Sequence, residues 1–232
     1  GGGMRYILGA LMSVALLSGC VTTSFYTSKK LAPETKHIAL VSPDVELSIL
    51  NAGGMNEPQA EWTKLAEEHL SNSIRKKLKT LNVTLVDNQT TRELQAGDSQ
   101  EVQLIKLHQA VGSTILEHQY NQPFRLPSKK GKFEWTLGKD VRYLKEKYGA
   151  DYALFIYVRD SYTSPGRATA IVVAALFGVG IQGGVQIGFA SLVDLNSGDI
   201  VWFNRLARTS GDLRTEKSSR ETVSLLLNNF PQ

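Results

Sequence analysis

The chain has 232 residues, of which 42% are hydrophobic and 21% are charged, and its formal net charge at pH 7 is +4. Such a composition is typical of one globular domain with an ordinary core, and the charge is too small to indicate a nucleic-acid-binding protein. A single cysteine, Cys20, occurs in the chain. An internal disulfide scaffold is therefore excluded.

The residues that precede Cys20 have the three parts of a secretory signal. Arg5 supplies the positive start, an apolar stretch runs over residues 6–17, and small residues follow it. This stretch is too short to cross the roughly 30 Å hydrocarbon layer of a membrane as a helix. Residues 1–3 precede the first methionine, Met4, and are left out of the fold prediction.

The four residues Leu17-Ser18-Gly19-Cys20 resemble the lipobox of bacterial lipoproteins. The resemblance implies that the Cys20 thiol receives a diacylglycerol, that a signal peptidase cuts before Cys20, and that the new amine is acylated. Several acyl chains hold a protein to a membrane durably. Residue 21 is valine and not aspartate, which by the sorting rule of such lipoproteins implies the outer membrane, with the protein facing the periplasm. A plain secreted protein is the alternative.

The sequence predicts three parts in the chain. Residues 1–19 form the extension and lipoprotein signal peptide, residues 20–36 form a lipidated tether, and residues 37–232 form a periplasmic domain. The tether is expected because residues 21–36 mix hydroxyl and charged side chains without a sustained hydrophobic period.

Strands and helices are expected to alternate in the first half of the domain. Apolar runs predict short strands over residues 37–42, 45–49 and 83–86. Apolar residues spaced i, i+3, i+4 predict a helix over residues 59–81, with His69 on its apolar stripe. A second helix is expected from Asp98, which forms a capping-box pattern with Glu101, towards Tyr120.

The second half is expected to contain the centre of the sheet. After a basic loop over residues 123–138 and a short helix over 139–148 that Gly149 ends, residues 150–160 are apolar on both faces, as in a central strand. Two further strands, 184–195 and 200–208, are joined by a hairpin signal at residues 196–199. A terminal helix is expected over residues 218–230, with Ser218 and Glu221 as its capping box. The fold class is therefore α+β, a single domain with a mostly antiparallel sheet, helices packed on it and a C-terminal helix.

Two stretches resemble the second half of the curli-secretion lipoprotein family and the amino-terminal domain of the Tol translocation protein. They are Gly149-Ala150-Asp151-Tyr152-Ala153-Leu154-Phe155 and the run Ala190-Ser191-Leu192-Val193-Asp194-Leu195-Asn196-Ser197-Gly198-Asp199-Ile200-Val201-Trp202. The resemblance implies a periplasmic domain of the kind found in envelope assembly and secretion. It does not imply a pore, because the membrane-crossing hairpins of the family have no counterpart here.

Residues 168–190 contain no charged side chain and are rich in Ala, Val and Gly. Two interpretations stay open. The segment is either a buried helix or strand followed by a glycine turn, or an exposed apolar hairpin that touches lipid or another subunit, because exposed apolar patches usually mark interaction sites. The possible interaction surface consists of Ile171, Val172, Val173, Leu176, Phe177, Val179 and Ile181.

No catalytic, cofactor or metal site is predicted, and no small-molecule substrate is identified. Residues 178–183 match GxGxxG, but no helix follows to present amides to a phosphate, so a turn is expected. The four histidines, His37, His69, His108 and His118, lack the spacing of metal ligands. Four aspartates lie near the ends of expected strands, where they could converge with the histidines into a hydrolase site: Asp151, Asp160, Asp194 and Asp199. Three loop lysines lie near two aromatic residues and form either a solvated loop or a contact for anionic lipid or peptidoglycan: Lys129, Lys130, Lys132, Phe133 and Trp135.

The sequence therefore favours a non-enzymatic outer-membrane lipoprotein that binds partners in envelope biogenesis, secretion or maintenance. Its expected partners are the membrane, through the lipid anchor, and an envelope protein or a second copy. One alternative is a membrane-associated oligomer or channel component that uses residues 168–190. The other is a hydrolase with an unrecognised site.

Overall fold

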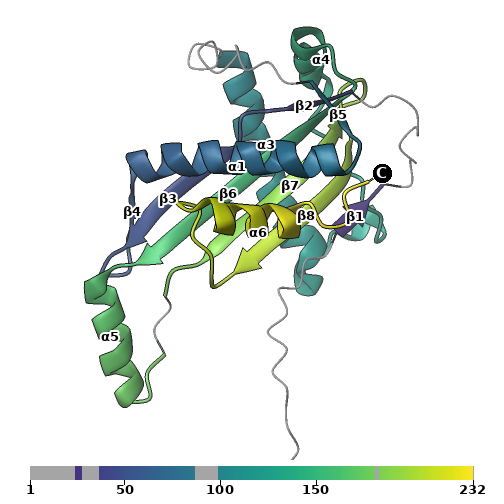
Figure 1. Cartoon of the computed structure of the whole chain (residues 1–232). Helices are drawn as coiled ribbons and strands as arrows, with labels where there is room; N and C mark the ends of the chain where they lie inside the picture. Colours follow the sequence, from purple (N-terminus) through teal and green to yellow (C-terminus); the bar gives the residue numbers. More distant parts are fainter. Residues whose placement is uncertain (1–23, 28–36, 87–98, 181–182, 232) are drawn as a thin grey trace, which may run out of the picture.

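The computed structural model describes residues 24–27, 37–86, 99–180 and 183–231, which form one sheet with helices on both faces (Figure 1). Its strands are β1 Ser24–Tyr26, β2 His37–Leu40, β3 Asp44–Leu50, β4 Asn56–Pro58, β5 Thr84–Val86, β6 Tyr152–Thr163, β7 Gln186–Asp194 and β8 Ile200–Arg208. Its α-helices are α1 Ala60–Thr80, α3 Ser99–Tyr120, α4 Arg142–Tyr148, α5 Pro165–Leu176 and α6 Glu216–Leu226. The described residues also contain three 3₁₀ turns, η1 Gln122–Phe124, η2 Pro127–Lys129 and η3 Lys139–Val141.

The sheet is mostly antiparallel, and the predicted fold class is confirmed. Strands β6, β7 and β8 form an antiparallel meander, β1 adds antiparallel to β8, and β4 adds antiparallel to β3. On the other side of β6, strands β2 and β3 pair in parallel with its first and second halves, and β5 pairs in parallel with β2. Strand β6 is therefore a central strand of the sheet, as its two apolar faces predict.

Strand β1 lies inside the segment that the sequence assigns to the tether. Ser24 pairs with Asn204 and Tyr26 with Trp202 of β8, and Phe25 stacks on Phe133 with ring centroids 5.6 Å apart. The sheet therefore begins only four residues after Cys20.

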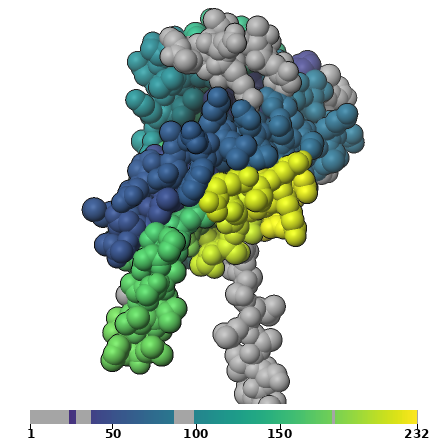
Figure 2. All heavy atoms as spheres, turned by 60° about the vertical axis from the view of Figure 1, so that its left-hand side comes forward, coloured from purple at the N-terminus to yellow at the C-terminus, as the bar shows by residue number. Residues whose placement is uncertain are grey.

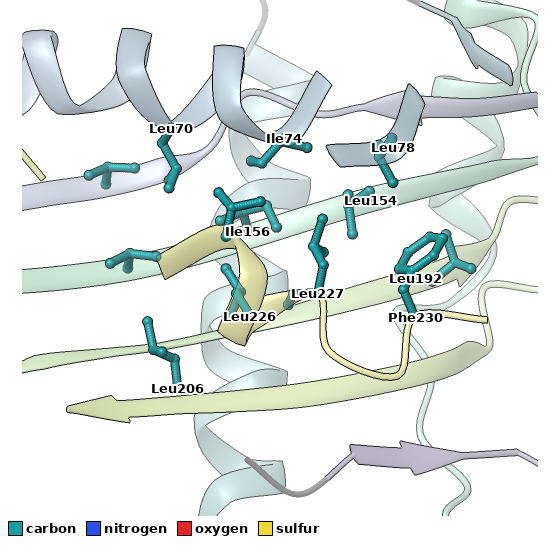
Figure 3. Close-up of a cluster of buried hydrophobic side chains, with 14 of the residues drawn as sticks. Leu70, Ile74, Leu78, Leu154, Ile156, Leu192, Leu206, Leu226, Leu227 and Phe230 are labelled. Carbon is teal, nitrogen blue, oxygen red and sulfur yellow. The ribbon is translucent and has the colours of Figure 1, made fainter. Parts of the chain in front are cut away.

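The first core lies between the sheet and the helices α1 and α6 (Figure 3). Leu154 and Ile156 of β6 face Leu70 and Ile74 of α1 and Leu226 of α6, which Figure 3 shows converging from three elements. The predicted helix over residues 59–81 is confirmed, and its apolar stripe covers this face.

Helix α6 begins earlier than the sequence indicates. Thr215, and not Ser218, is the N-cap, because the Thr215 hydroxyl accepts a hydrogen bond from the Ser218 amide at 3.3 Å. The C-terminal end is held from the sheet, since Nδ2 of the buried Asn204 donates to the carbonyls of Leu225 and Leu226 at 3.1 and 2.9 Å. These bonds satisfy carbonyls that the helix itself leaves unpaired.

The second core lies on the opposite face of the sheet, under α3 and α4. Helix α3 approaches β7 closely at Gly112, where an added Cβ would lie 2.1 Å from the Phe189 ring. Glu101 is buried, accepts hydrogen bonds from the Tyr148 hydroxyl at 2.9 and 3.0 Å, and forms an ion pair with Lys147. Asp98, the other half of the predicted capping box, lies outside the described residues.

The basic loop over residues 123–138 is packed onto the domain and is not a free loop. Phe133 and Leu137 are buried in the second core. The amide of Leu137 donates to the Gly198 carbonyl at 2.8 Å, and that of Ile200 donates to the Trp135 carbonyl at 2.8 Å. The loop is therefore fastened to the predicted β7–β8 hairpin.

Candidate functional site

Helix α5 projects from one end of the sheet as an arm, which we define as the described residues 164–180, 183 and 184 (Figure 1). Local sequence sets both ends of the helix. The Ser164 hydroxyl accepts a hydrogen bond from the Arg167 amide at 3.1 Å, and Pro165 occupies the first turn, where its missing N–H costs nothing. At the other end the amides of Gly178 and Val179 donate back to the carbonyls of Ala175 and Ala174 at 3.0 and 2.9 Å.

Gly178 supplies the left-handed backbone, with φ at +72°, that this C-terminal motif requires. The first glycine of GxGxxG therefore ends a helix, where the backbone presents carbonyl oxygens and repels phosphate. The prediction of a turn is confirmed at Gly178. Residues 181 and 182, which include Ile181 of the possible interaction surface, lie outside the described residues.

No residue of α5, all of which is described, is buried. The interpretation of residues 168–177 as a buried element is therefore wrong, and the segment is an exposed apolar helix. Ile171 is half-buried, while the large apolar side chains towards the tip are open to solvent: Val172 62%, Val173 48%, Leu176 81%, Phe177 80% and Val179 54%. Figure 2 shows the helix standing clear of the domain on the side that faces the viewer.

The base of the arm is fixed to the sheet by backbone hydrogen bonds. The Ser164 amide donates to the Leu50 carbonyl at 3.0 Å, and the Ser161 amide donates to the Val185 carbonyl at 3.0 Å. The Gly184 amide donates to the Thr163 hydroxyl at 2.8 Å. A side chain at position 184 would clash, because its Cβ would lie 2.1 Å from the Ser161 carbonyl oxygen. The two ends of the arm are therefore both held at fixed positions on the sheet.

Arg167 is the charged residue of α5, and it lies at the base of the arm. Its Nη1 is 3.5 Å from the Ala52 carbonyl. The next charged residue along the chain is Asp194, at the far end of β7. The arm beyond Arg167 therefore has no charged side chain with which to remain in water.

A buried polar cluster lies at the same end of the sheet. Oδ2 of Asp160 accepts hydrogen bonds from the Tyr162 hydroxyl at 2.5 Å, Gln186 Nε2 at 3.1 Å and the Leu213 amide at 3.2 Å. Burial raises the pKa of the Asp160 carboxyl above its usual range, and these donors oppose the rise. The cluster closes the segment before α6 onto β6, which is a structural role.

The four aspartates do not form one site. Asp151 and Asp194 lie at the end of β6 and β7 opposite to Asp160. Asp194 shapes the hairpin turn, where its Oδ1 accepts hydrogen bonds from the Asn196 and Ser197 amides. Among the described residues, no group of three His, Cys, Asp or Glu side chains could hold a metal ion.

His108 and Ser191 make a contact that the sequence did not indicate. The ring Nε2 lies 2.7 Å from the serine Oγ, and both residues are buried in the second core. Burial lowers the pKa of His108 to about 3, so the ring is neutral at physiological pH. The Phe155 and Phe189 rings lie 4.9 and 5.2 Å from it by centroid. A substrate has no access to the pair, which acts as a packing element.

The remaining sequence candidates are separate from one another. His69 is half-buried on α1, as its place on the apolar stripe predicts. The ring Nδ1 of His118 donates to the Phe124 carbonyl at 2.7 Å, and His37 Nδ1 lies 3.9 Å from Asp151 Oδ2.

The basic loop borders a groove of about 890 Å³ together with β1. Lys132 and Trp135 line this groove, and Lys129 Nζ lies 4.6 Å from the centroid of the Trp135 ring. Lys130 and Lys132 are exposed. Both interpretations of the loop, a solvated surface and a contact for anionic envelope material, are compatible with this arrangement.

Comparisons with known proteins give structural likeness only. No protein-family model matches the chain, and no curated protein matches it. The PelC dodecamer of Paraburkholderia phytofirmans is similar with a TM-score of 0.42 and 12% identity, over 91% of this chain and 99% of that one. Lipoprotein GNA1162 of Neisseria meningitidis is similar with a TM-score of 0.33 and 15% identity, over 75% of this chain and 81% of that one. The LpoB C-terminal domain of Salmonella enterica is similar with a TM-score of 0.30 and 16% identity, over 77% of this chain and 88% of that one. These likenesses are too low to transfer a function to this chain.

The lengths of the described helices bear on whether one of them could cross a membrane. Within the described ranges, no helix combines the length and the apolar character that crossing a membrane requires. At 12 residues, α5 is well short of the about 20 that a spanning helix needs.

Proposed function

We propose that this chain is an outer-membrane lipoprotein, anchored through Cys20 and facing the periplasm, that acts by binding in envelope biogenesis, secretion or maintenance. The proposal includes no reaction and no cofactor. The anchor rests on the lipobox at residues 17–20, and the binding role rests on the arm. An exposed apolar helix on a fixed base costs free energy in water, which supports a contact made by this helix in the envelope.

The exposure of Leu176 and Phe177 is the observation that carries this proposal. Leu176 is the last residue of α5 and Phe177 is its C-cap. The hydrogen bonds of Gly178 and Val179 close the motif directly after them, so the backbone holds both side chains outward. A side chain without such a constraint could fold back over neighbouring apolar surface.

Affinity capture of the lipidated protein from cell envelopes tests the binding role. The double variant L176D/F177D should lose the envelope components that the wild type retains. A matched double variant on α3, V102D/L107D, replaces two exposed apolar residues elsewhere and should keep them. Equal recovery from all three proteins would count against the arm as the binding surface.

The same arm favours a second candidate, a membrane-associated oligomer or channel component built through residues 168–190. An uncharged surface could pack against its copy on a neighbouring protein. Size-exclusion chromatography with light scattering in detergent would reveal an oligomer of the wild type, and the L176D/F177D variant should be monomeric under the same conditions. A wild-type monomer at high concentration, with and without detergent, would exclude this candidate.

A further inference from the structure

The arm and the lipid anchor leave the domain at the same end of the sheet. Strand β6 runs towards α5, β8 runs in the same direction as β6, and β1 runs antiparallel to β8. The N-terminal end of β1, at Ser24, therefore faces the end from which α5 projects. Figure 1 shows α5 pointing away from the sheet at that end.

The anchor is too short to hold this end far from a membrane. Cys20 precedes Ser24 by four residues, which span at most about 14 Å at full extension. Ser24 is level with Ile156 across the sheet, through Asn204 and Ala190. From Ile156, β6 continues for seven residues, about 23 Å, towards the arm. Helix α5 then adds up to about 18 Å. The arm therefore extends further in this direction than the anchor reaches, so the sheet must lie inclined to the membrane for the tip of the arm and the acyl chains of Cys20 to share one leaflet.

We propose that the tip of the arm inserts into the leaflet that holds the acyl chains of Cys20, at the boundary between headgroups and hydrocarbon. This inference rests on the anchor of the proposed function and names the lipid surface as what the arm binds. The tip consists of Val172, Val173, Leu176, Phe177 and Val179.

The distribution of charge fits a lipid surface. Arg167 precedes Leu176 by nine residues, about 13 Å along the helix axis. One half of a hydrocarbon layer is about 15 Å thick. With the tip in the leaflet, the guanidinium of Arg167 lies near the headgroups, where a cation is tolerated and anionic lipid attracts it.

A lipid surface also suits the sides of the helix better than a protein groove does. Protein interfaces carry a polar rim around an apolar centre. Beyond Arg167 the only polar side chain of α5 is Thr169, so the helix offers no such rim.

The backbone limits the depth of insertion. Residues 178–180, 183 and 184 are not helical, and unpaired amides and carbonyls are strongly disfavoured in hydrocarbon. The end of α5 is already closed by Gly178 and Val179, so the tip enters without free helix carbonyls from Ala174 and Ala175. Shallow insertion, in the range of about 5 to 10 Å typical of interfacial helices, buries the apolar tip and keeps the non-helical backbone after α5 near the headgroups.

The single cysteine of the chain makes the test specific. In a mature, unlipidated protein with Cys20→Ala, a new cysteine at Leu176→Cys carries the only polarity-sensitive dye. Phosphatidylethanolamine and phosphatidylglycerol vesicles should shift its emission to the blue, and a spin label near the headgroups should quench it more than one at the end of the acyl chain. The control, Asn196→Cys in the hairpin at the far end of the sheet, should show neither effect.

Loss of binding gives the second measurement. L176D/F177D should bind these vesicles at least tenfold more weakly than the unlipidated wild type, and V102D/L107D should bind as the wild type does. A blue shift that grows with protein concentration without vesicles would overturn the inference in favour of self-association. No shift with vesicles, together with loss of captured envelope proteins in L176D/F177D, would also overturn it while leaving the proposed binding function intact. If L176D/F177D lost neither vesicle binding nor the captured envelope proteins, the result would count against both the lipid contact and the proposed binding function of the arm.

Discussion

The imidazole of His108 on α3 and the hydroxyl of Ser191 on β7 share a hydrogen bond of 2.7 Å inside the second core. The two residues are 83 positions apart in the chain. A buried imidazole with a serine partner resembles half of a nucleophilic site, but its pKa is lowered to about 3 by desolvation. Because no solvent reaches the pair, its consequence is for stability and for the dependence of stability on pH.

The folded chain should lose stability in mild acid through His108. The unfolded chain binds a proton on this ring near pH 6.5, whereas the folded chain does so only near pH 3. The contribution is therefore present above pH 6.5 and is lost as the pH falls, by about 2 kcal/mol between pH 6.5 and pH 5. Denaturant unfolding at pH 7 and pH 5 should show this extra loss in the wild type and not in His108→Gln.

Ser191→Ala provides the companion measurement. It leaves the ring nitrogen of His108 without its partner, which should cost about 1–3 kcal/mol at pH 7. Equal acid sensitivity of the wild type and His108→Gln would contradict the assignment of the pH dependence to this ring.

Gly112→Ala should destabilise the domain, although alanine favours a helix by about 1 kcal/mol over glycine. The new Cβ would lie 2.1 Å from the Phe189 ring, so α3 must move away from the sheet. Overpacking of this kind costs about 1–3 kcal/mol. Thermal and denaturant unfolding should show the loss. Gly180→Ala, where an added Cβ meets no atom within 4 Å, is the control and should be nearly neutral.

Much of the fold could be predicted because its signals are local. The two apolar faces of β6 identify the central strand. The apolar face predicted for the terminal helix consists of Val223, Leu226, Leu227 and Phe230, and all four are buried although helix α6 itself ends at Leu226. The N-cap of α6 was misplaced because Thr215 and Ser218 are both capable caps, and only the backbone decides between them.

Long-range features left no comparable signal. The parallel pairing of β2 and β3 with β6 depends on register between distant segments. The exposure of the arm was equally hidden, because a run of Ala, Val and Leu has the same pattern in a buried helix and in an exposed one. The position of the arm depends on hydrogen bonds of Ser164 and Gly184 at its base, and the hydrophobic pattern of the helix does not encode them.

Cys20→Ala should abolish fatty-acid labelling of the protein and leave an uncleaved precursor. Residues 17–20 resemble a lipobox, a signal in which lipidation precedes cleavage, and the alanine variant lacks the thiol that lipidation needs. Metabolic labelling with palmitate and mass spectrometry of the N-terminus would measure both effects. A variant still processed at residue 20 would point to an ordinary secretory signal instead.

Two leucines that each end a helix allow the arm to be separated from the core. Leu176 is the last residue of α5 and is 81% exposed, whereas Leu226 is the last residue of α6 and is fully buried. Leu226→Ala should cost about 2–5 kcal/mol of unfolding free energy, because it removes contacts and leaves a cavity in the first core.

Leu176→Ala should change the unfolding free energy by less than about 0.5 kcal/mol, because the side chain makes no core contact. Denaturant unfolding of the unlipidated protein in the absence of vesicles measures both variants. A large loss on Leu176→Ala would mean that the arm packs on the domain in solution. The expected contrast, together with weaker vesicle binding by the aspartate variants, would mean that the apolar side chains of the arm serve a contact outside the domain, since they contribute nothing to its folding.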